Sequence, residues 1–220
     1  MTSEPTLQLY AFWRSSAAYR VRVALNLKGI SAHETLINLD AGEQWTPEYL
    51  AVNPQGALPA LVEPGQRPLT QSVAILEYLN ERYPEPPLLP TDLHARARVR
   101  SLAALMASDT HPLVVPRVKK YLMGTAGFDD AAWRAWQINW FTRGFQAMEA
   151  RLADDSATGT FCHGDVPTIA DICLASVVAV AKVFKIEVAD IPTVKGIVAR
   201  CEEIEGFARA NPMRQVGAPV

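Results

Sequence analysis

Hydrophobic and polar positions divide the chain into two halves that differ in their predicted secondary structure. In the first half, apolar residues alternate over residues 6–12, which predicts a strand covered on both faces. A helical pattern begins at Ser16 and ends at Gly29, where a C-terminal cap belongs, and residues 33–39 form a second predicted strand. This strand–helix–strand unit predicts two parallel strands joined by a right-handed crossover.

The rest of the first half continues as an irregular link followed by a β-β-α segment. The link includes a short helix around residues 47–50, and a strand then begins at Pro59. Proline is restricted to the first residue, the edge or a bulge of a strand, and a cis Leu58–Pro59 bond would suit this turn. A hairpin leads to a short strand around Leu69, and a helix is predicted over residues 71–83.

Prolines at 86, 87 and 90 indicate a linker between two domains, and no strand pattern follows them. Helical periodicity covers residues 92–108, 116–123, 129–152, 168–184 and 193–204. Thr168 and Asp171 form a variant of the capping box at the start of one of these helices. We therefore predict an α/β N-terminal domain at residues 1–86 and an all-α C-terminal domain at residues 92–220.

Composition restricts the classes of function. The 220-residue chain has a net charge of −2, which gives no electrostatic case for nucleic acid as a partner. No signal-peptide pattern opens the sequence, and its most apolar stretch, residues 172–184, is interrupted by Ser176 and Lys182. We expect a cytoplasmic protein with no membrane partner. The odd number and wide spacing of the three cysteines argue against a disulfide framework or a metal site. All three lie in the second half, so thiol–disulfide exchange by the chain's own cysteines is not expected in the first.

Two predicted helix starts carry the candidate chemistry. Ser15 and Ser16 open the first helix directly after a strand, and Gln71 and Ser72 open the last helix of the first half. Hydroxyl groups at such positions commonly serve as N-caps, but a helix N-terminus also favours an anion. Leu58, before a proline, leaves backbone groups that can pair with an extended peptide. These features together suit a small peptide-like ligand with one anionic end and an anionic sulfur.

Four segments of the chain, residues 13–29, 53–59, 71–79 and 164–171, resemble the signatures of zeta-class glutathione transferases. The resemblance covers essentially the whole chain and implies the glutathione transferase fold, with a thioredoxin-like α/β N-terminal domain and an all-α C-terminal domain. It also implies glutathione as cofactor and cis–trans isomerisation of maleylacetoacetate to fumarylacetoacetate, a step in tyrosine and phenylalanine breakdown. A dicarboxylic keto-acid substrate and a homodimer are expected on the same basis.

The resemblance implies roles for particular residues. Ser15, with Ser16 beside it, would act on the glutathione sulfur, and Leu58 would pair its backbone with the cysteinyl amide before a cis Pro59. The implied glutathione contacts are Ser15, Gln44, Leu58, Pro59, Gln71, Ser72 and His111. The substrate residues are expected among Arg14, Arg20, Val115 and Arg117. Arg20 and Arg22 are equally open to interpretation as solvated residues on a helix surface.

Some positions depart from the family pattern and leave alternatives open. Ala17 stands where many zeta sequences have cysteine, and Val114 and Val115 stand where related isomerases often carry polar residues. Val183 replaces an arginine often found before the phenylalanine. The substrate could instead be maleylpyruvate or an α-halo acid, and a third alternative is a non-catalytic binding protein. The basic residues around Arg98 are interpreted as a solvated or interdomain face.

Overall fold

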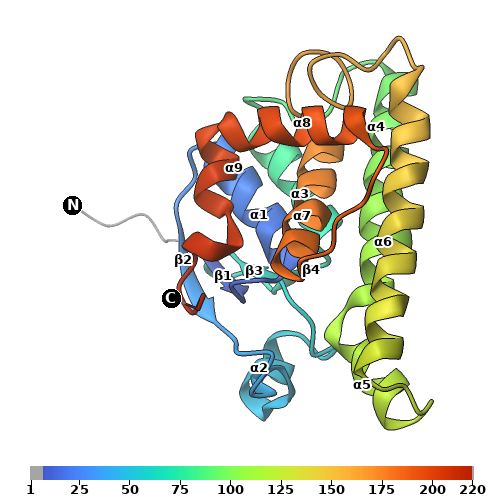
Figure 1. Ribbon diagram of the computed structural model, residues 1–220. Coiled ribbons are helices and arrows are strands. Elements are labelled where there is room, and N and C mark those ends of the chain that lie inside the picture. Colours follow the sequence, from blue (N-terminus) through green and yellow to red (C-terminus); the bar gives the residue numbers. More distant parts are fainter. Residues whose placement is uncertain (1–6, 220) are drawn as a thin grey trace. The chain divides into compact units, whose positions relative to one another are not determined.

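The computed structural model describes residues 7–219 and divides into two compact units. The first unit runs to Pro87 and resumes at Glu203, and the second spans residues 88–202. The sequence placed residues 92–220 in the helical domain, whereas the structure groups residues 203–219 with the α/β unit. Helix α9 (Glu205–Ala210) packs on α1 (Ser16–Leu27), as Figure 1 shows, and Asn26 donates a 2.9 Å hydrogen bond to the carbonyl of Gly206.

A four-stranded mixed sheet forms the centre of the first unit. Its strands are β1 (Leu7–Ala11), β2 (Ala32–Leu36), β3 (Ala60–Val62) and β4 (Leu69–Thr70), in the spatial order β2-β1-β3-β4. The pairing of β1 with β2 is parallel, as predicted, and the β1–β3 and β3–β4 pairings are antiparallel. Strand β2 ends at Leu36, three residues before the predicted end.

Two further helices and two 3₁₀ turns complete this unit. They are the 3₁₀ turn η1 (Glu43–Trp45), α2 (Pro47–Val52), α3 (Ser72–Arg82) and the 3₁₀ turn η4 (Pro212–Arg214). Leu9 and Leu61 of the sheet and Leu76 of α3 are almost fully buried. The alternating apolar residues of the first predicted strand therefore lie in the core. The strands end at the turns that carry the candidate residues.

The second unit is helical. Its elements are α4 (Leu93–Ala104), η2 (Leu105–Thr110), η3 (His111–Val114), α5 (Pro116–Gly124), α6 (Asp130–Ala153), α7 (Ile169–Val183) and α8 (Pro192–Glu203). The helix predicted to 108 stops at Ala104 and continues as the π-helix η2, where the Thr110 hydroxyl donates to the Leu105 carbonyl at 2.8 Å. Gly144 of α6 leaves space for Thr110, because a Cβ there would lie 2.3 Å from its Oγ1.

The predicted capping box of α7 is confirmed. Asp171 accepts hydrogen bonds from the backbone and hydroxyl of Thr168, and it also accepts one from the Cys162 backbone. Burial raises the pKa of this carboxyl group. Arg98, assigned from sequence to a solvated or interdomain face, instead bonds Asp155 at 2.7 Å and the Cys162 carbonyl at 2.6 Å. It thereby holds the loop before α7.

No helix within residues 7–219 combines the length and apolar character that a membrane span requires.

Candidate functional site

Ser15 caps α1 at the end of the turn that follows β1. Its backbone is extended, and its Oγ accepts a hydrogen bond from the Ala18 N–H at 3.2 Å. Its own N–H donates to the Phe12 carbonyl at 3.1 Å, which fixes the turn. Because the Oγ acts as an acceptor within the cap, the hydroxyl hydrogen stays available to a ligand. Ser15 is half-buried, whereas Ser16, the first residue of the helix, is only 3% exposed.

Gln71 and Ser72 form the N-terminus of α3. Gln71 has φ +67° and ψ 106°, a conformation that L residues rarely adopt and that costs backbone energy. Its side-chain amide donates to Oε1 of Gln55 at 2.8 Å. Ser72, by contrast, is 6% exposed and points its hydroxyl inward. Strain at a helix N-terminus is typical of positions where backbone geometry serves a ligand.

Arg20 joins these two helix starts. Its Nη1 donates to the Ser72 Oγ at 3.1 Å, and its Nη2 donates to the Ser16 Oγ at 3.5 Å. Only 2% of Arg20 is exposed, and Arg22 on the same helix is 5% exposed. The interpretation of both arginines as solvated surface residues was therefore wrong. The i, i+4 spacing of Ser16 and Arg20 was the sequence signal for the contact between these two residues.

The loop before β3 is fixed by side-chain hydrogen bonds to its backbone. The Leu58–Pro59 peptide bond is cis, as the sequence suggested. The Ala57 carbonyl accepts hydrogen bonds from the Tyr49 hydroxyl and the Asn53 side-chain amide, both at 2.7 Å. Burial raises the pKa of Tyr49 to about 12, so this hydroxyl remains a donor. No role was predicted for Tyr49 or Asn53 from the sequence.

Leu58 is left with its backbone groups available. It is half-buried, and its backbone makes no hydrogen bond with the other residues between 7 and 219. A buried backbone donor or acceptor without a partner is costly, so such groups normally pair with a ligand or with water. The backbone groups of Leu58 are therefore available to a ligand, and their pairing with an extended peptide stays a prediction.

Gln44 lies on η1 beside the same loop. Its Oε1 is buried and has no hydrogen-bond partner within the described part of the chain. The neighbouring Trp45 covers Gly56, where a Cβ would lie 2.4 Å from the indole ring. Gly56 also has φ +59°, so the loop depends on glycine at this position for two reasons.

Arg14 is tied to a carboxylate. Its guanidinium forms a two-pronged ion pair with Asp40, in which the Nη1–Oδ2 distance is 2.7 Å. It also lies 5.3 Å from the centroid of the Phe12 ring and 5.6 Å from that of Trp13. Contact with a substrate would have to share or displace Asp40.

The remaining predicted residues belong to the helical unit. His111 opens η3 directly after the π-helix, Val115 precedes α5, and Arg117 is exposed in its first turn. A π-helical turn inside a longer helix frequently marks a functional site. Val114, one of the positions at which the sequence departs from the expected family pattern, is 4% exposed and belongs to the core.

Comparisons with known proteins agree with this geometry. Residues 5–81 match the family model of the glutathione S-transferase N-terminal domain. The maleylacetoacetate isomerase of Rhizobium meliloti is 45% identical over 94% of this chain and 96% of its own. The chain belongs to the zeta-class glutathione transferase and maleylacetoacetate isomerase family. This membership confirms the predicted glutathione transferase fold.

Two solved structures of this family extend the comparison. The maleylacetoacetate isomerase of Methylobacterium extorquens AM1, with bound malonate and glutathione, is 48% identical, has a TM-score of 0.95 and covers 97% of this chain and 100% of its own. A bacterial zeta-class maleylpyruvate isomerase in its holo form is 41% identical, with a TM-score of 0.93 and coverages of 96% and 100%. The similar structures therefore include both a maleylacetoacetate isomerase and a maleylpyruvate isomerase.

Proposed function

We propose that this chain is a glutathione-dependent isomerase that converts maleylacetoacetate to fumarylacetoacetate in tyrosine and phenylalanine breakdown. The observation that carries the proposal is the link that Arg20 makes between the N-termini of α1 and α3. Each N-terminus favours negative charge, and the thiolate and the γ-glutamyl carboxylate of glutathione are the anionic groups we assign to them. One ligand can therefore engage both helices.

The residues around these N-termini fit a peptide-like cofactor. Leu58 offers backbone groups for the cysteinyl amide, and the buried Oε1 of Gln44 is an acceptor that lacks a partner. We assign Gln71 and Ser72 to the γ-glutamyl carboxylate, and Ser15 to the sulfur. Hydrogen bonds of this kind supply specificity because an unmatched buried group costs free energy.

Ser15 and the α1 N-terminus would set the protonation of the thiol. Glutathione held at Ser15 would supply a thiolate able to add reversibly to the cis double bond, so that isomerisation to the trans product would not consume the cofactor. A cysteine thiol has an ordinary pKa of about 8.5, and lowering it by about two units requires roughly 2.7 kcal/mol. A hydrogen bond from Ser15 to the charged form together with the helix N-terminus is of this order. Ser16 is buried behind it and supports the turn.

The keto-acid substrate carries carboxylates that arginine recognises. Arg117 is exposed and Arg14 is partly exposed, so we assign carboxylate contacts to these two. The buried Arg20 is assigned a positioning role, because its guanidinium is already bound to Ser72. We also propose His111 and Val115 as site residues, on the resemblance to the family. A cytoplasmic homodimer is proposed as the working form of the enzyme.

A coupled assay tests the function. Maleylacetoacetate and maleylpyruvate are compared as substrates at equal concentrations, with and without glutathione, and the remaining free thiol is measured after many turnovers. We expect isomerisation that requires glutathione and leaves its concentration unchanged. Stoichiometric loss of thiol would point to a transferase, and full activity without glutathione would overturn the proposal.

Variants of the two serines separate their roles. Ser15→Ala should lower turnover about 100-fold or more, since it removes the proposed donor to the thiolate. Ser16→Ala is the matched control, because it removes a hydroxyl one residue away that faces Arg20. Equal losses in both variants would remove the special role assigned to Ser15. Light scattering of the active protein tests the proposed dimer.

A further inference from the structure

The loop of residues 38–45 leads from β2 to Gln44, one of the proposed glutathione contacts. Asn38 fixes the loop internally, because its side-chain oxygen accepts hydrogen bonds from the backbone N–H groups of Asp40 and of the next residue, at 3.0 and 3.2 Å. The Asn38 N–H donates in turn to the carboxylate of Glu43 at 2.6 Å. These bonds within the loop set Asp40 and Gln44 in a fixed relation to each other.

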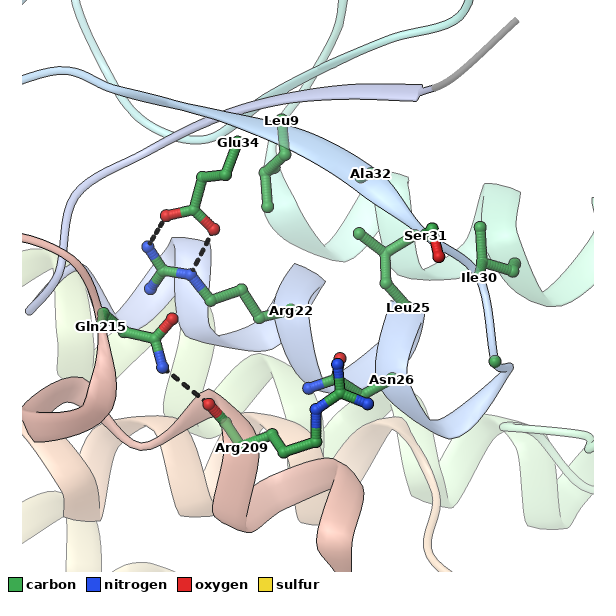
Figure 2. Close-up of a pocket in the computed structure, with 11 residues that line it drawn as sticks. Leu9, Arg22, Leu25, Asn26, Ile30, Ser31, Ala32, Glu34, Arg209 and Gln215 are labelled. Atoms are coloured by element: carbon green, nitrogen blue, oxygen red, sulfur yellow. Dashed lines mark hydrogen bonds and ion pairs between the residues drawn. The ribbon is translucent and has the colours of Figure 1, made fainter. Parts of the chain in front are cut away.

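Two ion pairs attach β2 and this loop to the β1–α1 segment. Figure 2 shows the first pair, in which Nε of Arg22 on α1 donates to the carboxylate of Glu34 on β2 at 2.8 Å. Nη2 of Arg22 donates both to Glu34 and to the Phe12 carbonyl. In the second pair, Arg14 donates to both carboxylate oxygens of Asp40, with an Nη1–Oδ2 distance of 2.7 Å. The first pair holds the strand, and the second holds the loop that follows it.

Arg14 is a stiff partner for Asp40. Its guanidinium lies 5.3 Å from the ring centroid of Phe12 and 5.6 Å from that of Trp13, and both rings are buried. An exposed ion pair normally contributes little, because two flexible side chains must be ordered to form it. Here the aromatic rings already restrict Arg14, and contact with both carboxylate oxygens is the stronger geometry. The pair is therefore suited to hold the loop in place.

Gln44 is the residue for which this placement matters. Its Oε1 is buried without a hydrogen-bond partner in the described part of the chain, which favours a ligand that brings a donor. The next residue, Trp45, packs over Gly56 in the loop before β3. In the sequence, Gln44 therefore lies between two anchors of its loop, the Asp40 ion pair and the Trp45 contact.

We propose that Asp40 is a positioning residue of the glutathione site, which acts by holding Gln44 in place relative to Ser15. Arg14 directly precedes Ser15, so its ion pair with Asp40 ties the loop of Gln44 to the turn that carries the proposed sulfur contact. A ligand that engages Gln44 and Ser15 then finds both already placed, and less free energy is lost to ordering the loop. This inference rests on the proposed binding of glutathione at these residues.

Calorimetric titration of the full-length protein with glutathione alone tests the proposal. Asp40 is exposed, and its replacement by alanine should raise the Kd for glutathione about threefold to fivefold. Asp40→Asn keeps a neutral acceptor and should lie between Asp40→Ala and the parent, whereas Asp40→Glu keeps the ion pair and should stay within about twofold of the parent. The direction of the change is decisive, because glutathione is an anion and loss of a nearby negative charge by itself tightens binding. Unchanged or tighter binding by Asp40→Ala would overturn the proposal.

Two control variants separate positioning from charge and from stability. Glu81→Gln removes one negative charge from an exposed position on α3 of the same unit. Glu202→Gln removes the exposed ion pair between Lys182 and Glu202 in the helical unit. Both controls should bind glutathione within about twofold of the parent. Thermal unfolding of every variant is measured alongside, and a Kd raised as much by Glu202→Gln as by Asp40→Ala would reduce the effect to general stability and overturn the proposal.

A double-mutant cycle tests whether Asp40 acts through Gln44. Asp40→Ala should weaken binding no further in a Gln44→Ala protein, but it should have its full effect in a Gln71→Ala protein, whose change lies at α3. Equal further losses in both backgrounds would overturn the proposal. In the isomerase assay, Asp40→Ala should raise the KM for glutathione and leave kcat at saturating glutathione within about twofold. Absence of glutathione binding in the parent would overturn the proposed function as well, whereas parental binding that Asp40→Ala leaves unchanged would overturn this inference alone.

Discussion

The Nη1 atom of Arg20 lies 3.1 Å from the Oγ atom of Ser72, 52 residues further along the chain. Arg20 belongs to α1 and Ser72 begins α3, and the same guanidinium reaches Ser16. A buried charge needs such partners, because removal from water is otherwise costly. The contact therefore fixes how two anion-favouring helix starts lie with respect to each other.

Replacement of Arg20 should affect both stability and glutathione affinity. Arg20→Met should lower the free energy of unfolding by about 2–4 kcal/mol, since two buried hydroxyl groups lose a charged donor. It should also raise the KM for glutathione more than it lowers kcat, because a positioning residue acts through Ser72. Arg20→Lys keeps one donor and should recover part of the affinity. Urea unfolding and steady-state kinetics make the measurement, and an unchanged KM in a folded Arg20→Met protein would contradict it.

Tyr49 should make the protein less stable at high pH. Its pKa is raised from 10.0 to about 12, so the unfolded chain loses this proton first. The unfolded state then binds fewer protons, and the free energy of unfolding falls as the pH rises from 10 towards 12. Between pH 9 and pH 11 the loss due to Tyr49 is about 1 kcal/mol.

Tyr49→Phe isolates this contribution. The variant loses the hydrogen bond to Ala57 at every pH, but it lacks the ionising group, so its stability should decline less between pH 9 and pH 11. Urea unfolding of both proteins at the two pH values gives the comparison. Parallel declines in the two proteins would show that Tyr49 does not titrate as described.

A side chain at Gly56 should destabilise the protein. Gly56→Ala places a Cβ 2.4 Å from the Trp45 ring at a φ of +59°, so both the loop and the indole must move. Gly65→Ala is the control, because Gly65 also has a positive φ, +77°, but has open space around it. Both variants pay about 1 kcal/mol for the backbone, and Gly56→Ala should lose about 1–3 kcal/mol more.

The effect of Gly56→Ala should extend to the cofactor. Displacement of Trp45 also moves its neighbour Gln44, so the KM for glutathione should rise in Gly56→Ala and stay unchanged in Gly65→Ala. Addition of Trp45→Ala to Gly56→Ala removes the steric conflict and should restore part of the lost stability. Identical unfolding curves for the two glycine variants would argue against a steric role for Trp45.

Gly144 in α6 should be required by the π-helix η2. Gly144→Ala brings a Cβ to 2.3 Å from the Thr110 hydroxyl oxygen, so it should destabilise the helical unit by about 1–3 kcal/mol despite the better helix propensity of alanine. Gly124→Ala, at a helical position with open space, should instead be neutral or slightly stabilising. Thermal unfolding of both variants measures the difference. A Gly144→Ala protein more stable than the parent would show that η2 can rearrange to accept the added Cβ without loss of stability.

Much of the candidate site was predictable from short segments. The serine pair after a strand predicted the α1 cap, and Thr168 with Asp171 predicted the start of α7, because capping depends on residues three positions apart. The proline after Leu58 indicated the turn before β3. In each of these cases the partners are close in the sequence, so the pattern contains the interaction.

The sequence by itself determined the order of the elements, the division into α/β and helical parts, and the helix starts that carry Ser15 and Ser72. Tertiary structure alone decided the burial of Arg20 and Arg22 and the docking of residues 203–219 on the α/β unit. The reason is physical: local patterns record hydrogen bonds and packing within a few residues. The fate of a charged side chain depends on partners such as Ser72 or Glu34, which only the folded chain brings within reach.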